Sequence, residues 1–180
     1  TRRGLTNRGL SLPCVDSVGD FTDQGFAEEL AECVQVAVNL GAPYVGVHTD
    51  SDNQAACVER MSTLLAVVGD APVTLLIETT GVYADTARLR DLLNRFADDR
   101  LAALWNMHST CVFGEDAEAT ITNLGAYVRH VHIHDFRREG EIFVPELVGE
   151  GSLPMRDLMN ALRSVNYDGF ISLQWNPDWI

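Results

Sequence analysis

The feature that most constrains the fold is a regular alternation between short apolar runs and longer stretches with helical periodicity. We expect strands over residues 9–15, 44–47, 73–77, 101–105, 128–134 and 169–173. Between them, apolar side chains recur at helical spacing over residues 25–40, 55–68, 86–96, 117–126 and 158–165. The run at 73–77 is apolar almost throughout, which is typical of a strand buried on both faces. An alternation of this kind predicts a parallel sheet covered by helices.

Polar residues that directly follow the predicted strands decide between two parallel-sheet architectures. An open dinucleotide-binding sheet would carry a GxGxxG motif between a strand and a helix, and the sequence has none. A (β/α)8 barrel instead gathers its active site at the carboxyl ends of all its strands. The polar residues found at these positions are His48, Glu78, Asn106, His108, His134, Asp135 and Gln174. This pattern favours an α/β fold of the (β/α)8 TIM-barrel type.

The length of the chain limits how much of such a barrel is present. Six predicted strands do not close an eight-stranded barrel, and a typical barrel needs ~250 residues, whereas this chain has 180. We therefore expect about six of the eight βα units, with roughly two N-terminal units absent. Residues 1–180 would form a single domain, Thr1 would not be a natural start, and the chain would be a fragment or part of a larger protein.

Composition excludes several classes of partner. The net charge of -13 disfavours binding to nucleic acid, which depends on Lys and Arg. There is no apolar run near the ~20 residues that a membrane span needs, and the basic N-terminus lacks the apolar centre of a signal peptide. The four cysteines are scattered without a CxxC pair, which indicates reduced thiols in a cytoplasmic protein.

The segment from Tyr127 to Phe136 carries three histidines at strand spacing. Side chains two residues apart point to the same face of a strand, so His130, His132 and His134 share one face. We predict that His132, at the strand end, is a metal ligand, because neutral imidazole is the commonest one. His130 lies deeper and is expected to be buried structure. His134 and Asp135 lie at the rim, where they either contact substrate or form a surface pair.

The other strand ends each allow a functional and a structural interpretation. Glu78 is costly at the mouth of a buried strand unless it is paired, hydrogen-bonded or bound to metal; otherwise it caps the next turn. Asn106 can offer an amide oxygen to a metal, or it is a turn residue. Gln174 is a second amide where an acid would be chemically useful. Trp105 and Trp175 either wall a polar pocket by stacking or pack at the barrel rim.

Four segments, in order and at matching separations, resemble one known family. Residues 104–109 (LWNMHS) are similar to a strand ending in Trp-Asp-x-His-His, and residues 130–135 (HVHIHD) to His-Val-His-x-Lys-Asp. Residues 149–154 (GEGSLP) resemble a glycine loop before the last helix, and residues 167–175 (YDGFISLQW) resemble Gly-Tyr-x-Gly-x-x-Ser-Leu-Glu-Trp. The chain thus resembles the xylose isomerase-like TIM barrels, a sugar phosphate isomerase/epimerase group that includes ketose 3-epimerases and inosose dehydratases.

The resemblance implies a divalent metal held by Glu, Asp, His and Glu at four successive strand ends. Carried over by position, these ligands fall on Glu78, Asn106, His132 and Gln174, so two of the four are amides. Hard cations prefer carboxylate oxygens, and we therefore expect a site for Mn²⁺, Mg²⁺, Co²⁺ or Zn²⁺ that is weak or lost. Ser109 replaces the second residue of the His-His pair, which leaves His108.

The resemblance also implies a metal-assisted proton transfer next to a carbonyl, carried out by two glutamates on opposite faces of the substrate. Here Gln174 replaces one glutamate, so Glu78 would be the base, with His108 or His134 standing in for the other. The expected activity is that of a sugar or polyol isomerase, epimerase or dehydratase. Its small polar substrate would be contacted by a set of five residues at the strand ends: His48, His134, Asp135, Trp105 and Trp175.

Two other readings remain open. The amides also suit a barrel domain that has lost catalysis and serves binding, regulation or assembly, as a homo-oligomer or as a domain fused to a larger protein. A DNA-repair endonuclease shares the barrel, but it would want more His and acidic zinc ligands and a basic face, so it ranks low.

Overall fold

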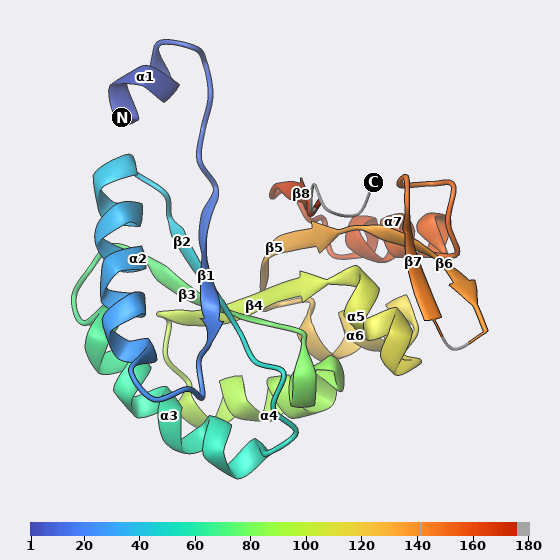
Figure 1. Cartoon of the computed structure of the whole chain (residues 1–180), viewed down its shortest axis with the longest axis horizontal. Helices are drawn as coiled ribbons and strands as arrows, with labels where there is room; N and C mark the ends of the chain where they lie inside the picture. The colour runs from blue at the N-terminus through green and yellow to red at the C-terminus, as the bar shows by residue number, and fades with distance from the viewer. Residues whose placement is uncertain (141, 176–180) are drawn as a thin grey trace.

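A computed structural model of the chain describes residues 1–140 and 142–175 and contains one curved parallel sheet with helices on its outer face (Figure 1). The sheet order is β1-β2-β3-β4-β5-β8, with every neighbouring pair parallel. The strands are β1 (Cys14–Asp20), β2 (Tyr44–His48), β3 (Thr74–Glu78), β4 (Leu101–Asn106), β5 (Val128–Ile133) and β8 (Ile171–Leu173). The predicted alternation and the six parallel strands are confirmed.

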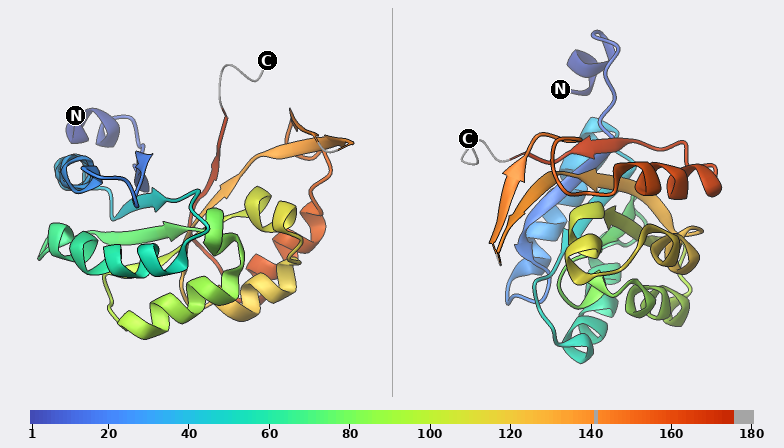
Figure 2. Two further views of the ribbon diagram at one scale, coloured as in Figure 1. Left: turned by 60° about the horizontal axis from the view of Figure 1, so that its bottom comes forward. Right: turned by 90° about the vertical axis from the view of Figure 1, so that its right-hand side faces the viewer.

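Apart from α1, which precedes β1, the helices follow the strands along the chain and cover the convex side of the sheet (Figure 2). They are α1 (Arg2–Thr6), α2 (Phe26–Leu40), α3 (Gln54–Val68), the 3-10 helix η1 (Gly81–Ala84), α4 (Thr86–Phe96), α5 (Met107–Phe113), α6 (Ala117–Leu124) and α7 (Met155–Ser164). Helix α2 packs beside α3, α4 beside α6, and α6 beside α7. Right-handed crossovers of this type place one helix between successive parallel strands.

The sheet is curled like a barrel but is open between its first and last strands. Among the described residues, β1 pairs with β2 alone and β8 pairs with β5 alone. The side chains of Val18, Ile171 and Leu173 on these two edge strands are exposed. A barrel closes only when its first and last strands are hydrogen-bonded, so six strands form the greater part of a (β/α)8 barrel, as predicted.

Strand alternation gives the sheet two different faces. Toward the helices, a large core contains outward side chains of the central strands β2 to β5, among them Ile77, Trp105 and Val131. On the inner face, a smaller apolar cluster consists of Cys14, Leu76, Ala102 and Leu104. Residues two positions further along each strand therefore also point inward, at the carboxyl end of the sheet.

Two strand predictions require correction. The first strand was expected over residues 9–15 but runs over Cys14–Asp20. Pro13 lacks a backbone N–H and precedes the ladder, while β1 is an edge strand whose mixed burial hides its apolar signal. The expected loop after the histidine strand contains an antiparallel pair, β6 (Asp135–Glu139) and β7 (Ile142–Glu146). Gly140, with φ of 63°, supplies the left-handed backbone at the turn.

Three helical elements were not predicted: α1, α5 and the 3-10 helix η1. Helix α5 begins directly after β4, where the pattern showed only polar residues following a strand. Helix α1 has five residues and lies in the basic N-terminal segment, where no apolar periodicity marks it. All four cysteines are free thiols, as expected. Among the described residues, no helix combines the length and apolar character that crossing a membrane requires.

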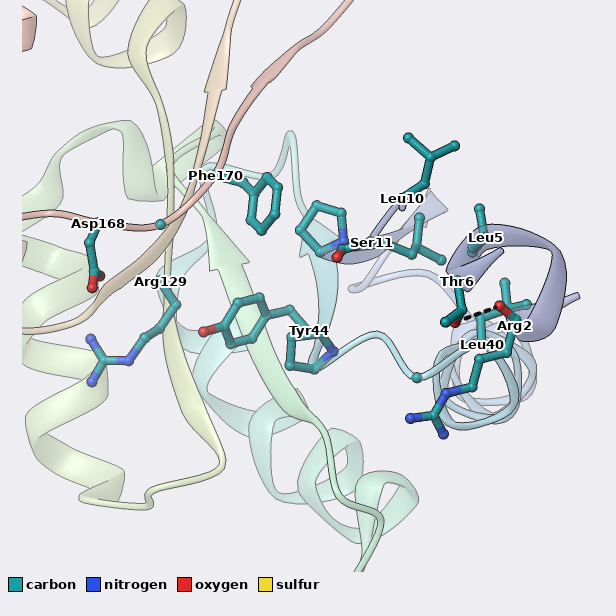
Figure 3. Close-up of a pocket in the computed structure, with 15 residues that line it drawn as sticks. Arg2, Leu5, Thr6, Leu10, Ser11, Leu40, Tyr44, Arg129, Asp168 and Phe170 are labelled. Carbon is teal, nitrogen blue, oxygen red and sulfur yellow. Dashed lines mark hydrogen bonds between the residues drawn. The ribbon is translucent and has the colours of Figure 1, made fainter. Parts of the chain in front are cut away.

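A cavity of about 410 Å³ lies at the opposite end of the sheet from the strand-end residues selected above. Its wall includes Arg2 and Leu5 of α1, Tyr44 at the start of β2, and Arg129 and Phe170 (Figure 3). These residues lie at or before the amino ends of the strands. Because TIM-barrel active sites form at the carboxyl ends, this cavity is separate from the candidate site.

Candidate active site

Four strand ends converge on a row of hydrogen-bonded polar side chains. Glu78 ends β3, Asn106 ends β4, His132 lies in β5, and Gln174 follows β8. Asn106 and His132 are register partners on adjacent strands. The Asn106 amide nitrogen donates to Glu78 Oε1 at 2.8 Å and to Gln174 Oε1 at 3.4 Å. The structure thus brings together the four residues that the sequence placed at one site.

Glu78 is the carboxylate at the centre of this row. Its Oε1 accepts from the Asn106 amide and from His132 Nδ1, which lies 3.0 Å away. Glu78 is only 8% exposed. A buried carboxylate needs such donors because leaving it unpaired would cost several kcal/mol. Both donors are side chains, so they can be rearranged without moving the backbone.

Asp16 is a site residue that is not among those predicted above. It lies in β1, and its Oδ2 is 3.5 Å from His132 Nε2, so the imidazole lies between the carboxylates of Asp16 and Glu78. Gly46 makes room for it, since a Cβ there would come within 2.3 Å of Asp16 Oδ1. Asp16 lies within β1 and not at its end, so the strand-end rule would have missed it, whereas alternation from Cys14 would have placed it on the inner face had the first strand been predicted over its true range.

The two carboxylates keep His132 charged. Burial lowers the pKa of His132, but the hydrogen bonds to Asp16 and Glu78 outweigh it and raise the pKa to about 9. Asp16 is half exposed; partial desolvation works to raise its pKa, whereas the hydrogen bond and charge of His132 lower it below its usual range. At neutral pH the ring therefore donates from both nitrogens, and the positive charge of the site resides on His132.

Asn106 also caps the helix that follows it. Its Oδ1 accepts from the backbone N–H of Ser109 at 3.1 Å, in the N-cap position of α5. The amide orientation is fixed by these partners, because the reverse orientation would bring Oδ1 to 2.8 Å from Glu78 Oε1, and two acceptors would then repel each other. The turn role expected for Asn106 and its place in the site are thus combined in one side chain.

Asp135 has a different environment from Glu78. It is 1% exposed and accepts four backbone hydrogen bonds, from Phe136, Gly149, Gly151 and Leu153, at 2.8–3.1 Å. Gly151 permits this approach, since a Cβ at that position would lie 2.2 Å from Asp135 Oδ1. Asp135 therefore holds the glycine loop between β7 and α7 against the end of β5.

An aromatic cluster lies beside the row, formed by His108, His134, Phe136 and Phe143. The rings of His108 and His134 are 4.1 Å apart between centroids, and His108 meets Phe136 edge to face at 4.8 Å. Burial lowers the pKa of His108 to about 4, so the ring is neutral at pH 7. His134 is hydrogen-bonded to Gln174, which joins this cluster to the polar row.

Comparisons with known proteins identify the family of the chain. The family model described as "Xylose isomerase-like TIM barrel" matches residues 3–179. The chain belongs to this family. A Streptomyces coelicolor protein named "Putative hydroxypyruvate isomerase" is 32% identical over 74 residues, which are 41% of this chain and 24% of that protein. The match therefore spans about a quarter of the relative's length.

Solved structures show the same family fold at low sequence identity. The IOLI protein with a bound zinc atom has a TM-score of 0.81 at 12% identity, covering 99% of this chain and 74% of that one. A D-tagatose 3-epimerase-like protein has a TM-score of 0.79 at 14% identity, covering 99% and 76%. The chain therefore has the family fold over about three quarters of these structures.

The donors at the row do not fit the divalent ion that the xylose isomerase-like family implies. The oxygen of Asn106 is used by the helix cap, and its N–H groups face Glu78 and Gln174. Glu78 is the one anionic donor among the four positions, and a cationic imidazole lies beside it. Among the described residues, no group of three or more His, Cys, Asp or Glu side chains is arranged to hold a metal ion.

The remaining predicted residues lie outside the hydrogen-bonded row. Trp105 is fully buried on the helix side of β4, where its Nε1 donates to Thr110 Oγ1 at 3.0 Å. His130 is buried and hydrogen-bonded to Ser172 Oγ at 2.8 Å, which matches the structural role expected for it. His48 ends β2 and has Glu29 as a charged neighbour. Trp175 is the residue directly after Gln174 and is partly buried.

Proposed function

We propose that this chain carries the greater part of the site of a sugar or polyol isomerase- or epimerase-type enzyme, in which Glu78 moves a proton at the carbon next to a carbonyl. The observation that carries the proposal is a buried carboxylate at the carboxyl end of a barrel strand, held by two side-chain donors. A general base must first lie within hydrogen-bonding reach of the proton that it takes, and only then does its pKa decide how well it works. The family membership and the isomerase and epimerase names of its relatives support the reaction class.

The residues around Glu78 suit a small polyhydroxylated substrate. Asn106 and Gln174 offer amide donors and acceptors, which pair well with sugar hydroxyls. His134 and Asn106 are joined through Gln174, so the polar row continues toward the aromatic cluster. Aromatic faces next to polar groups are a common way to bind a small ligand. Trp175 and His48 are proposed to extend this surface.

In this proposal the site does not bind the divalent ion at all, rather than binding it weakly. The cation of the site is the imidazolium of His132, held between Asp16 and Glu78. A fixed positive charge next to a developing oxyanion stabilises it in a site from which water is excluded. We assign that role to His132, and no step passes through a metal.

A second candidate function is binding without catalysis. Two observations favour it. Gln174 is an amide at the position where the family resemblance has the second acid, and the amide nitrogen of Asn106 hydrogen-bonds Glu78 directly. In that case the same surface binds a sugar or polyol, alone or within a larger protein, and no carbon–hydrogen bond breaks.

Solvent isotope exchange separates the two functions. The protein is incubated in D₂O with D-glyceraldehyde, dihydroxyacetone, hydroxypyruvate or D-fructose, and deuterium at the carbon next to the carbonyl is followed by NMR. We expect incorporation with at least one compound, and Glu78→Gln should lower its rate by about 100-fold or more. Glu118→Gln, an exposed carboxylate on α6, is the matched control and should leave the rate unchanged. Saturable binding in calorimetry without any exchange would support the binding function instead.

A further inference from the structure

Thr79 is a buried residue that directly follows Glu78, and its side chain contacts the neighbouring strand. The hydroxyl oxygen of Thr79 accepts from the backbone N–H of Asn106 at 2.9 Å, and the hydroxyl donates to the backbone carbonyl of the same residue at 3.3 Å. Thr79 is 0% exposed. One hydroxyl therefore engages both main-chain polar groups of the residue whose side-chain amide hydrogen-bonds the proposed base.

The main-chain pairing of β3 with β4 stops before it reaches Asn106. The last register pair is Glu78 with Leu104, and the N–H of Thr79 donates to the Leu104 carbonyl at 3.0 Å. Thr80, which would face Asn106 in the next pair, instead donates its N–H back to the Glu78 carbonyl at 2.8 Å. The backbone of β3 thus turns away. The Thr79 hydroxyl takes the place of a peptide group at this point, since a hydroxyl is both a donor and an acceptor.

The position of Asn106 decides how Glu78 is held. The side-chain nitrogen of Asn106 lies 2.8 Å from Glu78 Oε1, and its side-chain oxygen accepts from the Ser109 N–H at 3.1 Å. The second contact ties Asn106 to the start of α5, whereas the Thr79 hydroxyl ties it to the end of β3. Without that hydroxyl the Asn106 N–H would be buried and unpaired, which is unfavourable. The end of β4 would then move relative to β3 to find another acceptor.

The hydroxyl of Thr110, which is also buried near the end of β4, has a different role. It accepts from Trp105 Nε1 at 3.0 Å and donates to the Met107 carbonyl at 3.3 Å, while the Asn106 carbonyl is 3.5 Å away. These contacts lie within β4 and α5. Thr110 therefore fixes the start of the helix, whereas Thr79 fixes the separation between the two strand ends.

We infer that Thr79 is a positioning residue of this site: its hydroxyl fixes the end of β4 against β3 and thereby sets the separation of the Asn106 amide from the Glu78 carboxylate. The inference rests on Glu78 being the base proposed above. Successive side chains of a strand point to opposite faces, so Thr79 faces away from the inner side of the sheet on which Glu78 lies. Thr79 acts through Asn106 and does not touch the substrate.

The first test is independent of catalysis. The side-chain NH₂ signals of Asn106 in ¹H–¹⁵N spectra, assigned by their loss in Asn106→Asp, report the hydrogen bond to Glu78. Thr79→Val keeps the shape of the side chain without the hydroxyl and should shift these signals, and Thr79→Ser should restore them. If Thr79→Val does not fold, Thr79→Ala gives the same comparison. Unchanged signals in the variant without the hydroxyl would overturn the inference.

The second test is the rate of deuterium incorporation in D₂O described above. Thr79→Val should lower this rate about tenfold or more, and Thr79→Ser should restore it. Thr120→Val is the matched control and should leave the rate unchanged, because Thr120 is also 0% exposed but its hydroxyl donates to Glu115 Oε1 at 2.7 Å, in the helix layer.

The outcomes separate this inference from the proposed function. An equal loss of rate in Thr120→Val, or no recovery in Thr79→Ser, would overturn the positioning role and leave the proposed function intact. If the unmodified chain exchanges deuterium into none of the compounds, the proposed enzyme fails. The Asn106 signals then decide by themselves whether Thr79 positions the amide against Glu78.

Discussion

Glu78 and Asp135 are two buried carboxylates at the carboxyl ends of strands, and they are held in opposite ways. Asp135 accepts four backbone N–H groups of the loop around it, so both of its oxygens are committed to main-chain geometry. Glu78 accepts from two side chains, the Asn106 amide and the His132 ring. Backbone donors fix the course of the chain, while side-chain donors can exchange partners when a ligand enters. The comparison separates Asp135, which holds a loop in place, from Glu78, which we propose as the catalytic base.

The largest expected difference comes from replacing each carboxylate with its isosteric amide. Asp135→Asn turns an NH₂ group toward two backbone donors, and leaving them unpaired should lower the free energy of unfolding by about 3 kcal/mol. Glu78→Gln keeps the oxygen that Asn106 and His132 use, and should cost about 1 kcal/mol. Urea unfolding measures both.

The exposed carboxylate Asp91 provides the baseline, since Asp91→Asn should change the stability by less than about 0.5 kcal/mol. An equal or larger loss for Glu78→Gln than for Asp135→Asn would remove the distinction between the two carboxylates.

The next largest effect is a pH dependence of the stability, which comes from His132, the hydrogen-bond partner of Glu78. The pKa of His132 is raised to about 9 in the folded chain, from ~6.5 when unfolded. The contribution of protonated His132 to the free energy of unfolding is therefore complete below pH ~6.5, and it is lost as the pH rises toward the pKa of His132 in the folded chain. Between pH 6.5 and 8.5 the free energy of unfolding should fall by about 2 kcal/mol, and His132→Gln should flatten this slope.

His108→Gln is the control for that slope. The pKa of His108 is lowered to about 4, so the ring is neutral in the folded chain throughout the window and contributes no loss there. A slope that persists in His132→Gln would mean that another group causes it.

The smallest expected effect comes from substitutions that restore acids to the polar row. The unmodified chain should bind Mn²⁺ or Zn²⁺ more weakly than a millimolar dissociation constant, since its donors do not fit the ion. Asn106→Asp together with Gln174→Glu should raise the affinity at least tenfold, about 1.4 kcal/mol. The new Asp keeps one oxygen for the helix cap and offers the other to the ion.

Isothermal calorimetry on dialysed protein reports the metal stoichiometry and affinity. Stoichiometric uptake by the unmodified chain, abolished by His132→Ala, would show that the polar row is a working metal site. It would also show that the Asn106 amide turns over to admit the ion.

Much of the fold and of the site could be predicted because both depend on strand periodicity. The buried run that ends at Glu78 and the alternating histidines placed these residues on the inner face at the carboxyl end. Asp16 was not predicted because an edge strand, exposed on one side, has weak apolar alternation. The hairpin of β6 and β7 was hidden for a similar reason, since few of its side chains are buried.

The sequence by itself determined the order of the six parallel strands, the acidic surface, and the presence of amides where the family resemblance has acids. Those properties are set by residue type and spacing, which are local. Only the tertiary structure decided that Asn106 turns its nitrogen toward Glu78, that Asp16 holds the far side of His132, and that Asp135 is taken up by its loop. Each of these depends on which donors meet a carboxylate across strands distant in the chain, because hydrogen-bond partners are assigned by packing and not by sequence spacing.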